Sequence, residues 1–257
     1  MENPLHHIRP KVSAIISAYF CEEYLDPRIW NLLGQTLCPE IVVVVKSGSK
    51  EHEIAERCFR MAQHQKNTPG KWAYQLEGFQ IVETKDIPTI YKAWNLGIKA
   101  AKGEYITNAN SDDLLAEYGI FKLAHELDKR PEVGLVYADV DIVHTLTGGF
   151  DSAWREGFFR WAEGGHQELL QQCFVGPMPM WRRSLHEKHG YFDMEFRSAG
   201  DYEFWLRLSK AGVQFHHLRE VLGIYLRRED QAEQRFGREG IAAKETIEAR
   251  KRHDRPG

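Results

Sequence analysis

The sequence predicts an α/β protein with a doubly wound, mostly parallel central sheet flanked by helices. Two observations lead to this fold class. Strand-like and helix-like segments alternate along the first half of the chain, an order typical of right-handed βαβ units. In addition, residues 41–45 are an uninterrupted run of β-branched side chains, IVVVV. A continuous apolar run indicates a strand that is buried on both faces, as in the centre of a parallel sheet.

The first half of the chain is predicted to contain four strands, at residues 11–19, 41–45, 79–84 and 103–110. The helix after the first strand is expected to begin close to Asp26, because Pro27 is tolerated only in a first turn. The next two helices are expected at 51–65 and 91–102, with Gly103 just past the end of the latter.

The pattern changes in the second half. A helix is expected to start at Leu114 and to stop before Pro131, followed by a strand at 133–144. After a loop-rich stretch, a helix at 201–212 and late strands within 213–226 complete the predicted elements. The charged tail, 229–257, is compatible with an outer helix, a partner-binding helix or a frayed end.

Composition narrows the functional class. The chain has 257 residues, with 34 Lys+Arg against 37 Asp+Glu and a net charge of −3, which argues against a nucleic-acid binder that covers many phosphates. No apolar run approaches the roughly 18–20 residues of a membrane span, and the start has no signal-like segment. The four cysteines lack CxxC spacing, so we expect free thiols. The twelve histidines form no HExxH motif. These features predict a soluble cytoplasmic protein.

Three aspartates, at two places in the chain, are candidates for chemistry. Asp112 and Asp113 follow the fourth strand, at the carboxyl edge where ligands of such sheets bind. Adjacent carboxylates repel each other unless a cation or hydrogen-bond donors are present, and Mg²⁺ or Mn²⁺ takes such oxygens together with substrate phosphates. The alternative is that one of them caps the helix expected at Leu114. Asp201 opens a later helix, where it is either a cap or a general base that deprotonates an acceptor hydroxyl.

Four motifs occur in an order that resembles the family-two glycosyltransferases, which are inverting enzymes with the GT-A nucleotide-diphosphosugar fold. They are SAIISAYFCEEYL, YKAWNLGIKAAKGEYI, NANSDDLL, and SAGDYEFWLRLSKAG followed by VLGIYLRR. The resemblance covers residues 11–228 and implies one domain, with a nucleotide-sugar-binding half at 11–113 and an acceptor-binding half at 114–228. Residues 1–10 are then an N-terminal extension, and 229–257 a charged helical tail.

The resemblance also implies residue roles. Asp113 and Asp112 match the carboxylates that hold a divalent cation, Mn²⁺ or Mg²⁺, at the donor diphosphate, and Asp201 matches the catalytic base. The positions implied for donor binding are Ala18, Tyr19, Glu22, Ser47, Asn95, Ser111 and Asp112. Those implied for the acceptor and sugar pocket are Met178, Trp181 and Glu203, although a buried aromatic is the commoner outcome for a tryptophan.

The chain departs from the family pattern at three places. It has Lys46-Ser47-Gly48-Ser49 after the second strand instead of an acidic turn, Asn110 at the first acidic position of the DXD-like motif, and no histidine near YLRRED. A sugar-nucleotide pyrophosphorylase and a dinucleotide-dependent dehydrogenase are disfavoured, because neither a glycine-rich basic loop nor GxGxxG follows the first strand.

We therefore expect an inverting glycosyltransferase of glycan or polysaccharide biosynthesis. It would use a UDP-, GDP- or dTDP-linked sugar and a glycan, lipid-linked or protein acceptor, in the cytoplasm or peripherally at the inner face of the membrane. The alternative is a catalytically impaired GT-A-fold module that only binds nucleotides or glycans. Slow donor hydrolysis with Mn²⁺ would separate the two.

Overall fold

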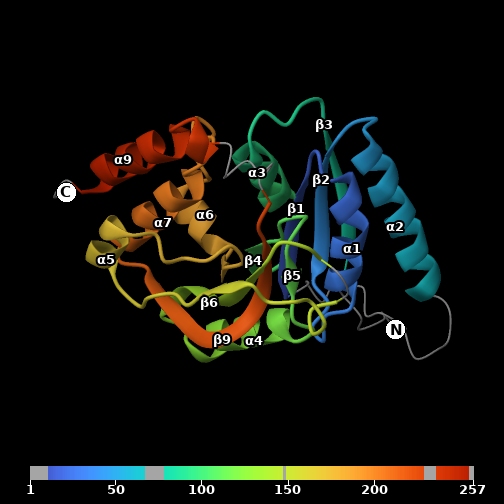
Figure 1. Ribbon diagram of the computed structural model, residues 1–257, viewed down its shortest axis with the longest axis horizontal. Coiled ribbons are helices and arrows are strands. Elements are labelled where there is room, and N and C mark those ends of the chain that lie inside the picture. Colours follow the sequence, from blue (N-terminus) through green and yellow to red (C-terminus); the bar gives the residue numbers. More distant parts are fainter. Residues whose placement is uncertain (1–10, 67–77, 147–148, 229–235, 255–257) are drawn as a thin grey trace, which may run out of the picture.

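Within the part of the chain that the structure describes, nine strands form one mixed sheet at the centre of the protein (Figure 1). The computed structural model describes residues 11–66, 78–146, 149–228 and 236–254, so the predicted extension 1–10 and the beginning of the predicted tail, 229–235, lie outside the described residues. The elements up to the middle of the chain are β1 (Val12–Ala18), α1 (Glu22–Leu33), β2 (Glu40–Lys46), α2 (Lys50–Lys66), β3 (Phe79–Thr84), α3 (Ile90–Ala100), β4 (Tyr105–Asn108), β5 (Leu114–Leu115) and α4 (Gly119–Lys129). The later elements are β6 (Val133–Val143), β7 (Gly157–Phe159), α5 (His166–Gln171), β8 (Met180–Arg182), α6 (Ser184–His189), α7 (Gly200–Lys210), β9 (Gln214–Leu226) and α9 (Ile241–His253).

The first half of the sheet is the predicted parallel unit, in the order β3-β2-β1-β4. Residues 41–45 in β2 are fully buried, as expected for a strand covered on both faces. Successive residues of β1 and β2 point to opposite faces. Ile16 and Val43 pack with α1 and α2, whereas Ile15 and Val44 pack with α3. The doubly wound prediction is therefore confirmed.

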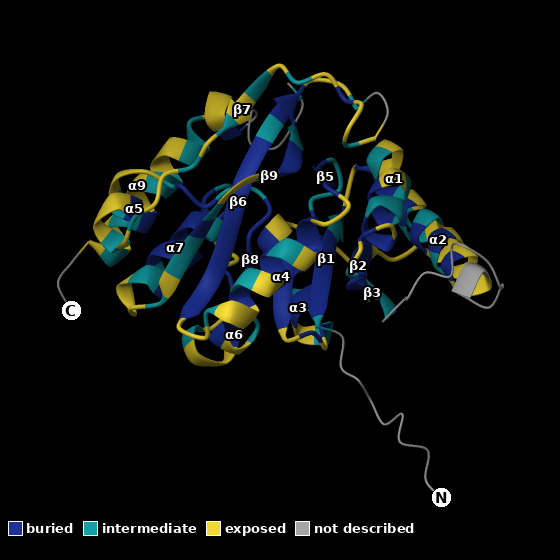
Figure 2. Cartoon of the chain, turned by 90° about the horizontal axis from the view of Figure 1, so that it is seen from below, coloured by how far each residue is buried: buried dark blue, intermediate teal, exposed yellow. Residues whose placement is uncertain are grey.

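The second half of the sheet brings antiparallel neighbours. β8 lies between β4 and β6 and pairs antiparallel with both, and β5 pairs antiparallel with the far end of β9. The longest ladder, β6 with β9, is parallel and contains register shifts. The expected late strands are thus one bent strand, β9, that reaches from β6 to the end of the sheet (Figure 1). Its neighbour β6 is almost entirely buried (Figure 2).

Two helix starts differ from the prediction. α1 begins at Glu22 rather than near Asp26, and Pro27 lies inside it. Proline removes the hydrogen bond to the carbonyl of Glu23. Both residues are exposed, so water can hydrate that carbonyl. α4 begins at Gly119 rather than Leu114, because Leu114 and Leu115 are held in the sheet by β9.

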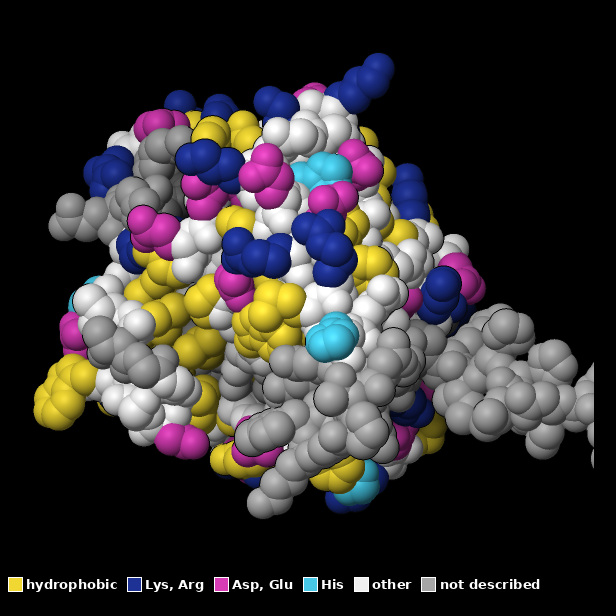
Figure 3. Space-filling model, turned by 90° about the vertical axis from the view of Figure 1, so that its right-hand side faces the viewer, with side chains coloured by type: hydrophobic (Ala, Val, Ile, Leu, Met, Phe, Trp, Pro, Cys, Tyr) yellow, Lys and Arg dark blue, Asp and Glu magenta, His cyan; other side chains and the backbone are white. Residues whose placement is uncertain are grey.

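Charged side chains of both signs lie on the surface of the protein. Basic and acidic side chains are interspersed on the side formed by α1 and α2 (Figure 3), in keeping with the small net charge. The four cysteines are free, as predicted. No helix in the described part of the chain is long and apolar enough to cross a membrane. The predicted tail contains α9, which lies along α7 (Figure 1).

Candidate active site

The ends of several strands meet at the carboxyl edge of the parallel sheet. Cys21, which follows β1, donates its backbone N–H to Glu51 at the start of α2, over 3.2 Å. Burial raises the pKa of the Cys21 thiol to about 12, an increase that the neighbouring Ser111 opposes. Ser111 follows β4, so the segments after β1, β2 and β4 lie together. This is the edge where ligands bind in open α/β sheets.

Asp113 is held at this edge between two chain segments. It is 1% exposed, and its Oδ1 accepts the backbone N–H of Leu226 at 3.2 Å while its Oδ2 accepts Nδ2 of Asn110 at 3.0 Å. Burial and the charge of Asp112 raise the pKa of Asp113 to about 8. Since the next helix begins only at Gly119, the alternative that Asp112 or Asp113 caps a helix at Leu114 is wrong.

Two arginines share this acidic site. Arg228, just after β9, pairs through Nη2 with Oδ2 of Asp112 at 3.1 Å. Arg28, on α1, is fully buried, and burial lowers its pKa to about 10 against the opposing charges of Asp113 and Asp112. Its Nη1 donates to Asn31, whereas its Nε and Nη2 find no partner among the residues that the structure describes. The site therefore combines two carboxylates with two guanidinium groups.

Asp201 lies in the first turn of α7, against the start of α3. The hydroxyl of Tyr91, a residue only 2% exposed, donates to Asp201 Oδ1 at 3.2 Å. The contact depends on Gly200, because a Cβ at that position would lie 2.8 Å from Cε2 of the Tyr91 ring. Since α3 follows β3, this places Asp201 at the same edge of the sheet as the strand ends described above.

The three residues expected in an acceptor pocket lie in packed surroundings. Trp181 is 1% exposed and donates Nε1 to Nε2 of His186 at 2.8 Å, so its ring lies in the core, the commoner outcome for a tryptophan. Met178 is also buried. Glu203 pairs with Arg207 and with His253, and these partners lower its pKa against the effect of burial.

Five of the seven residues expected to bind the donor divide into two groups. Tyr19 is exposed at the end of β1, Glu22 pairs with Lys50 at 3.1 Å, and Ser47 contacts the carbonyl of Thr84. These three residues lie at the carboxyl edge of the sheet. Ala18 and Asn95 are buried.

The amide of Asn95 is engaged twice by the backbone of Phe192, at 2.8 and 3.0 Å. These contacts tie α3 to the segment after α6.

Sequence reasoning missed three residues of the site. Arg28 lies on the apolar stripe of α1, between Leu25 and Leu32, and a charge in that stripe is a signal that could have identified it. Arg228 ends the YLRR motif but was not singled out. Tyr91 opens the YKAWNLGIKAAKGEYI motif, but nothing local indicates its contact with Asp201, which is 110 positions away.

Two carboxylates supply only part of a metal coordination shell. No group of three or more His, Cys, Asp or Glu side chains is arranged around a metal position within the described residues. Mg²⁺-type sites often use one or two carboxylates, with substrate phosphates and water as the other ligands. Asp112 and Asp113 fit that arrangement, because their like charges are close together and Asp113 is buried.

The chain is similar in sequence to known glycosyltransferases. The family model described as Glycosyl transferase family 2 matches residues 13–190, more than half of the chain. An uncharacterized glycosyltransferase of Haemophilus influenzae is 22% identical over 90% of this chain and 73% of its own length. The chondroitin synthase of Pasteurella multocida is 25% identical over 86% of this chain, which spans 21% of that protein.

Solved structures share the fold. A mannosyltransferase, PcManGT from Pyrobaculum calidifontis, in complex with GDP-Man and Mn²⁺, superposes with a TM-score of 0.66 at 17% identity, covering 93% of this chain and 65% of that one. S. aureus TarS 1–349 with UDP-GlcNAc gives 0.65 at 19% identity, covering 87% and 60%. The predicted GT-A-type fold is confirmed. The chain belongs to Glycosyl transferase family 2 and is a glycosyltransferase.

Proposed function

We propose that this glycosyltransferase moves a sugar from a nucleotide-diphosphate sugar to an acceptor hydroxyl by single displacement with inversion, and that Asp201 is the general base. The observation that supports this most is the contact of Asp201 with Tyr91 at the carboxyl edge of the sheet. A base must be held in one orientation to receive a proton, and a buried tyrosine hydroxyl holds one oxygen of this carboxylate.

The chemical step needs one base and one stabilised leaving group. The acceptor oxygen forms a bond to the anomeric carbon as the bond from that carbon to the diphosphate oxygen breaks. The acceptor proton passes to the Asp201 carboxylate, and the electron pair of the broken bond leaves with the diphosphate.

The diphosphate would lie by the segment that follows β4. Asp112 and Asp113 would hold a divalent cation there, Mn²⁺ or Mg²⁺, which when bound neutralises charge on the departing diphosphate. Arg228, within 3.1 Å of Asp112, orients that carboxylate and adds positive charge. The buried Arg28 offsets the remaining negative charge of the pair.

The names of the solved neighbours and the relatives support a class of donor and a biosynthetic role for this protein. Solved neighbours hold UDP, UDP-GlcNAc and GDP-Man, which supports a UDP-, GDP- or dTDP-sugar donor bound by residues 11–113. Residues 114–228 would bind the acceptor, which is a glycan, a lipid-linked glycan or a protein. Chondroitin and hyaluronan synthases among the relatives favour polysaccharide synthesis. Its setting would be the cytoplasm or the inner face of the membrane, as the sequence predicts. A catalytically impaired binding module is not favoured, because Asp112, Asp113 and Asp201 are all present.

The test is the Asp201→Asn variant. A panel of UDP-, GDP- and dTDP-sugars, scored by thermal shift with Mn²⁺, first identifies the donor, because a ligand of the folded state raises its stability. Loss of a general base typically costs about 10²–10⁴-fold, so Asp201→Asn should lose turnover by that factor and keep its donor affinity. Asp254→Asn, at an exposed position, is the matched control. Near-normal turnover in Asp201→Asn would remove Asp201 from the mechanism.

A further inference from the structure

We infer that Glu245, on the C-terminal helix α9, is a positioning residue that fixes the entry of α7 and thereby the place of Asp201. The inference rests on the proposed role of Asp201 as the base. It concerns a part of the chain beyond residues 13–190, the range matched by the family model.

The Glu245 carboxylate binds three successive backbone N–H groups. Arg197 donates to Oε1 at 2.9 Å and to Oε2 at 3.1 Å, Ser198 donates to Oε2 at 2.8 Å, and Ala199 donates to Oε2 at 2.9 Å. Successive N–H groups that converge on one anion form a rigid concave turn, and hydrogen bonds to a charged acceptor are about twice as strong as neutral ones. The three residues directly precede α7, and Asp201 follows Ala199 by two positions.

α7 needs this help because its own N-terminus lacks a cap. The N-cap residue is Ala199, whose side chain cannot accept a hydrogen bond, whereas Ser, Thr, Asp and Asn are the usual residues there. In a capping box, a Glu or Gln at the third helical position bonds the N-cap N–H. That position holds Tyr202 in α7. Glu245 supplies the missing carboxylate from another helix.

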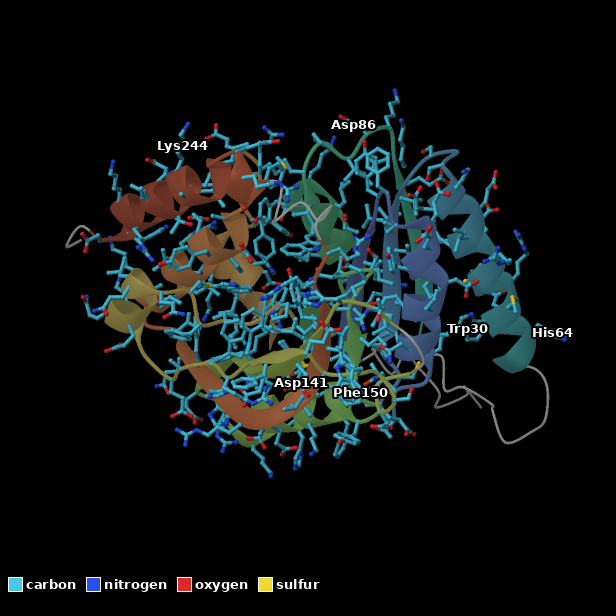
Figure 4. All side chains as sticks on the ribbon, viewed as in Figure 1. Trp30, His64, Asp86, Asp141, Phe150 and Lys244 are labelled. Carbon is cyan, nitrogen blue, oxygen red and sulfur yellow. The ribbon has the colours of Figure 1, made fainter. Side chains whose placement is uncertain are left out.

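α9 is itself fixed on α7, so Glu245 has a defined position. His253 contacts Glu203 at 2.9 Å, and Arg250 donates to the hydroxyl of Tyr202 at 3.0 Å. Lys244, next to Glu245 in the sequence, points away from the rest of the molecule (Figure 4). The helix thus presents Glu245 inward and its neighbour outward.

Any shift of the segment pinned by Glu245 is transmitted to the base. Gly200 lies between this segment and Asp201, and its backbone packs against the Tyr91 ring. A displacement there would change the contact between the Tyr91 hydroxyl and Asp201. Misplacement of a catalytic group by about 1 Å can cost about 10²-fold in rate.

The first experiment compares Glu245→Gln with Glu248→Gln by hydrogen–deuterium exchange. Glu248 lies on the same helix, is exposed and pairs with Arg252, so the control has the same charge change on the same helix. We expect faster exchange of the amides at 197–199 in Glu245→Gln, with the core strands unchanged, and no such change in the control. Unchanged protection of these amides in Glu245→Gln would overturn the inference. This readout requires neither donor nor acceptor.

The second experiment measures turnover of the donor that the panel identifies, with Mn²⁺. We expect kcat of Glu245→Gln to fall about tenfold while the donor KM stays within about twofold, because the donor site is at the end of β4. In the Asp201→Asn background, Glu245→Gln should cause no further loss, since positioning is irrelevant once the base is gone. An equal loss in both backgrounds indicates a merely structural role and would overturn the inference.

The proposed role of Asp201 as the base and the proposed positioning role of Glu245 can fail separately. If Asp201→Asn retains turnover, the proposed base is wrong whatever Glu245 does. If Asp201→Asn loses turnover and Glu245→Gln keeps normal kcat, the base stands and the positioning role of Glu245 is wrong.

Discussion

Replacing Tyr91 with phenylalanine tests the orientation of Asp201 with a minimal change. The variant removes the hydroxyl that donates to Asp201 Oδ1 at 3.2 Å and keeps the ring that packs against Gly200. A hydrogen bond to a charged group contributes about 1.5–3 kcal/mol. This one is longer than the usual O–H···O distance of about 2.7–2.8 Å, and Asp201 is partly accessible to water. We therefore expect the lower end, about 1.5 kcal/mol, or roughly a tenfold fall in kcat.

The expected loss should not depend on pH near neutrality. Burial and the charge of Asp201 raise the pKa of Tyr91 well above its ordinary value, so the hydroxyl remains protonated and remains a donor. The ratio of wild-type to Tyr91→Phe kcat should accordingly be constant between about pH 6 and pH 9.

The assay is steady-state turnover of the identified donor, with melting temperature measured in parallel. Tyr118→Phe, at an exposed position, is the control and should match the wild type. In the Asp201→Asn background the Tyr91→Phe change should have no further effect. The reasoning is refuted if Tyr91→Phe keeps kcat within about twofold of the wild type, or if it loses as much activity without Asp201 as with it.

Three further changes test other parts of the structure. Asp113→Ala should weaken calorimetric donor binding in Mn²⁺ by tenfold or more, and equal affinities of wild type and variant in Mn²⁺ would count against a metal role. Gly97→Ala should destabilise the protein, because the new Cβ would lie 2.4 Å from Ile15 Cγ2. Overpacking costs roughly 1–3 kcal/mol, which outweighs the gain of about 1 kcal/mol in helix propensity from glycine to alanine. A higher denaturation midpoint would contradict this. Burial lowers the pKa of His186 to about 4. Its stabilising contribution is therefore fully present above about pH 6.5, the pKa of an unperturbed histidine, and is lost as the pH falls to about 4. The free energy of unfolding should fall by about 3 kcal/mol over that range. His186→Gln, which keeps an acceptor for Trp181, should flatten the pH dependence of urea midpoints over that range; an unchanged slope would argue against the buried neutral histidine.

Local pattern was sufficient for the parallel half of the fold. The run at 41–45 identifies β2 because burial on both faces leaves no polar position in the strand. The alternation of strands and helices then implies the doubly wound arrangement. The same logic failed at Leu114, where an apolar, helix-compatible segment is held in the sheet by β9, a strand more than 100 positions later. Such a long-range pairing overrides local helix propensity.

Pattern also located the acidic segment and Asp201 but not their surroundings. The sequence by itself determined the fold class, the family resemblance and the two candidate positions, since these depend on residue types at short spacing. Only the tertiary structure decided that Asp113 is buried beside Arg28 rather than capping a helix, that Trp181 lies in the core, and that Tyr91 and Glu245 hold the surroundings of Asp201. These contacts join residues that are distant in sequence, and their existence depends on which elements the folded chain brings together.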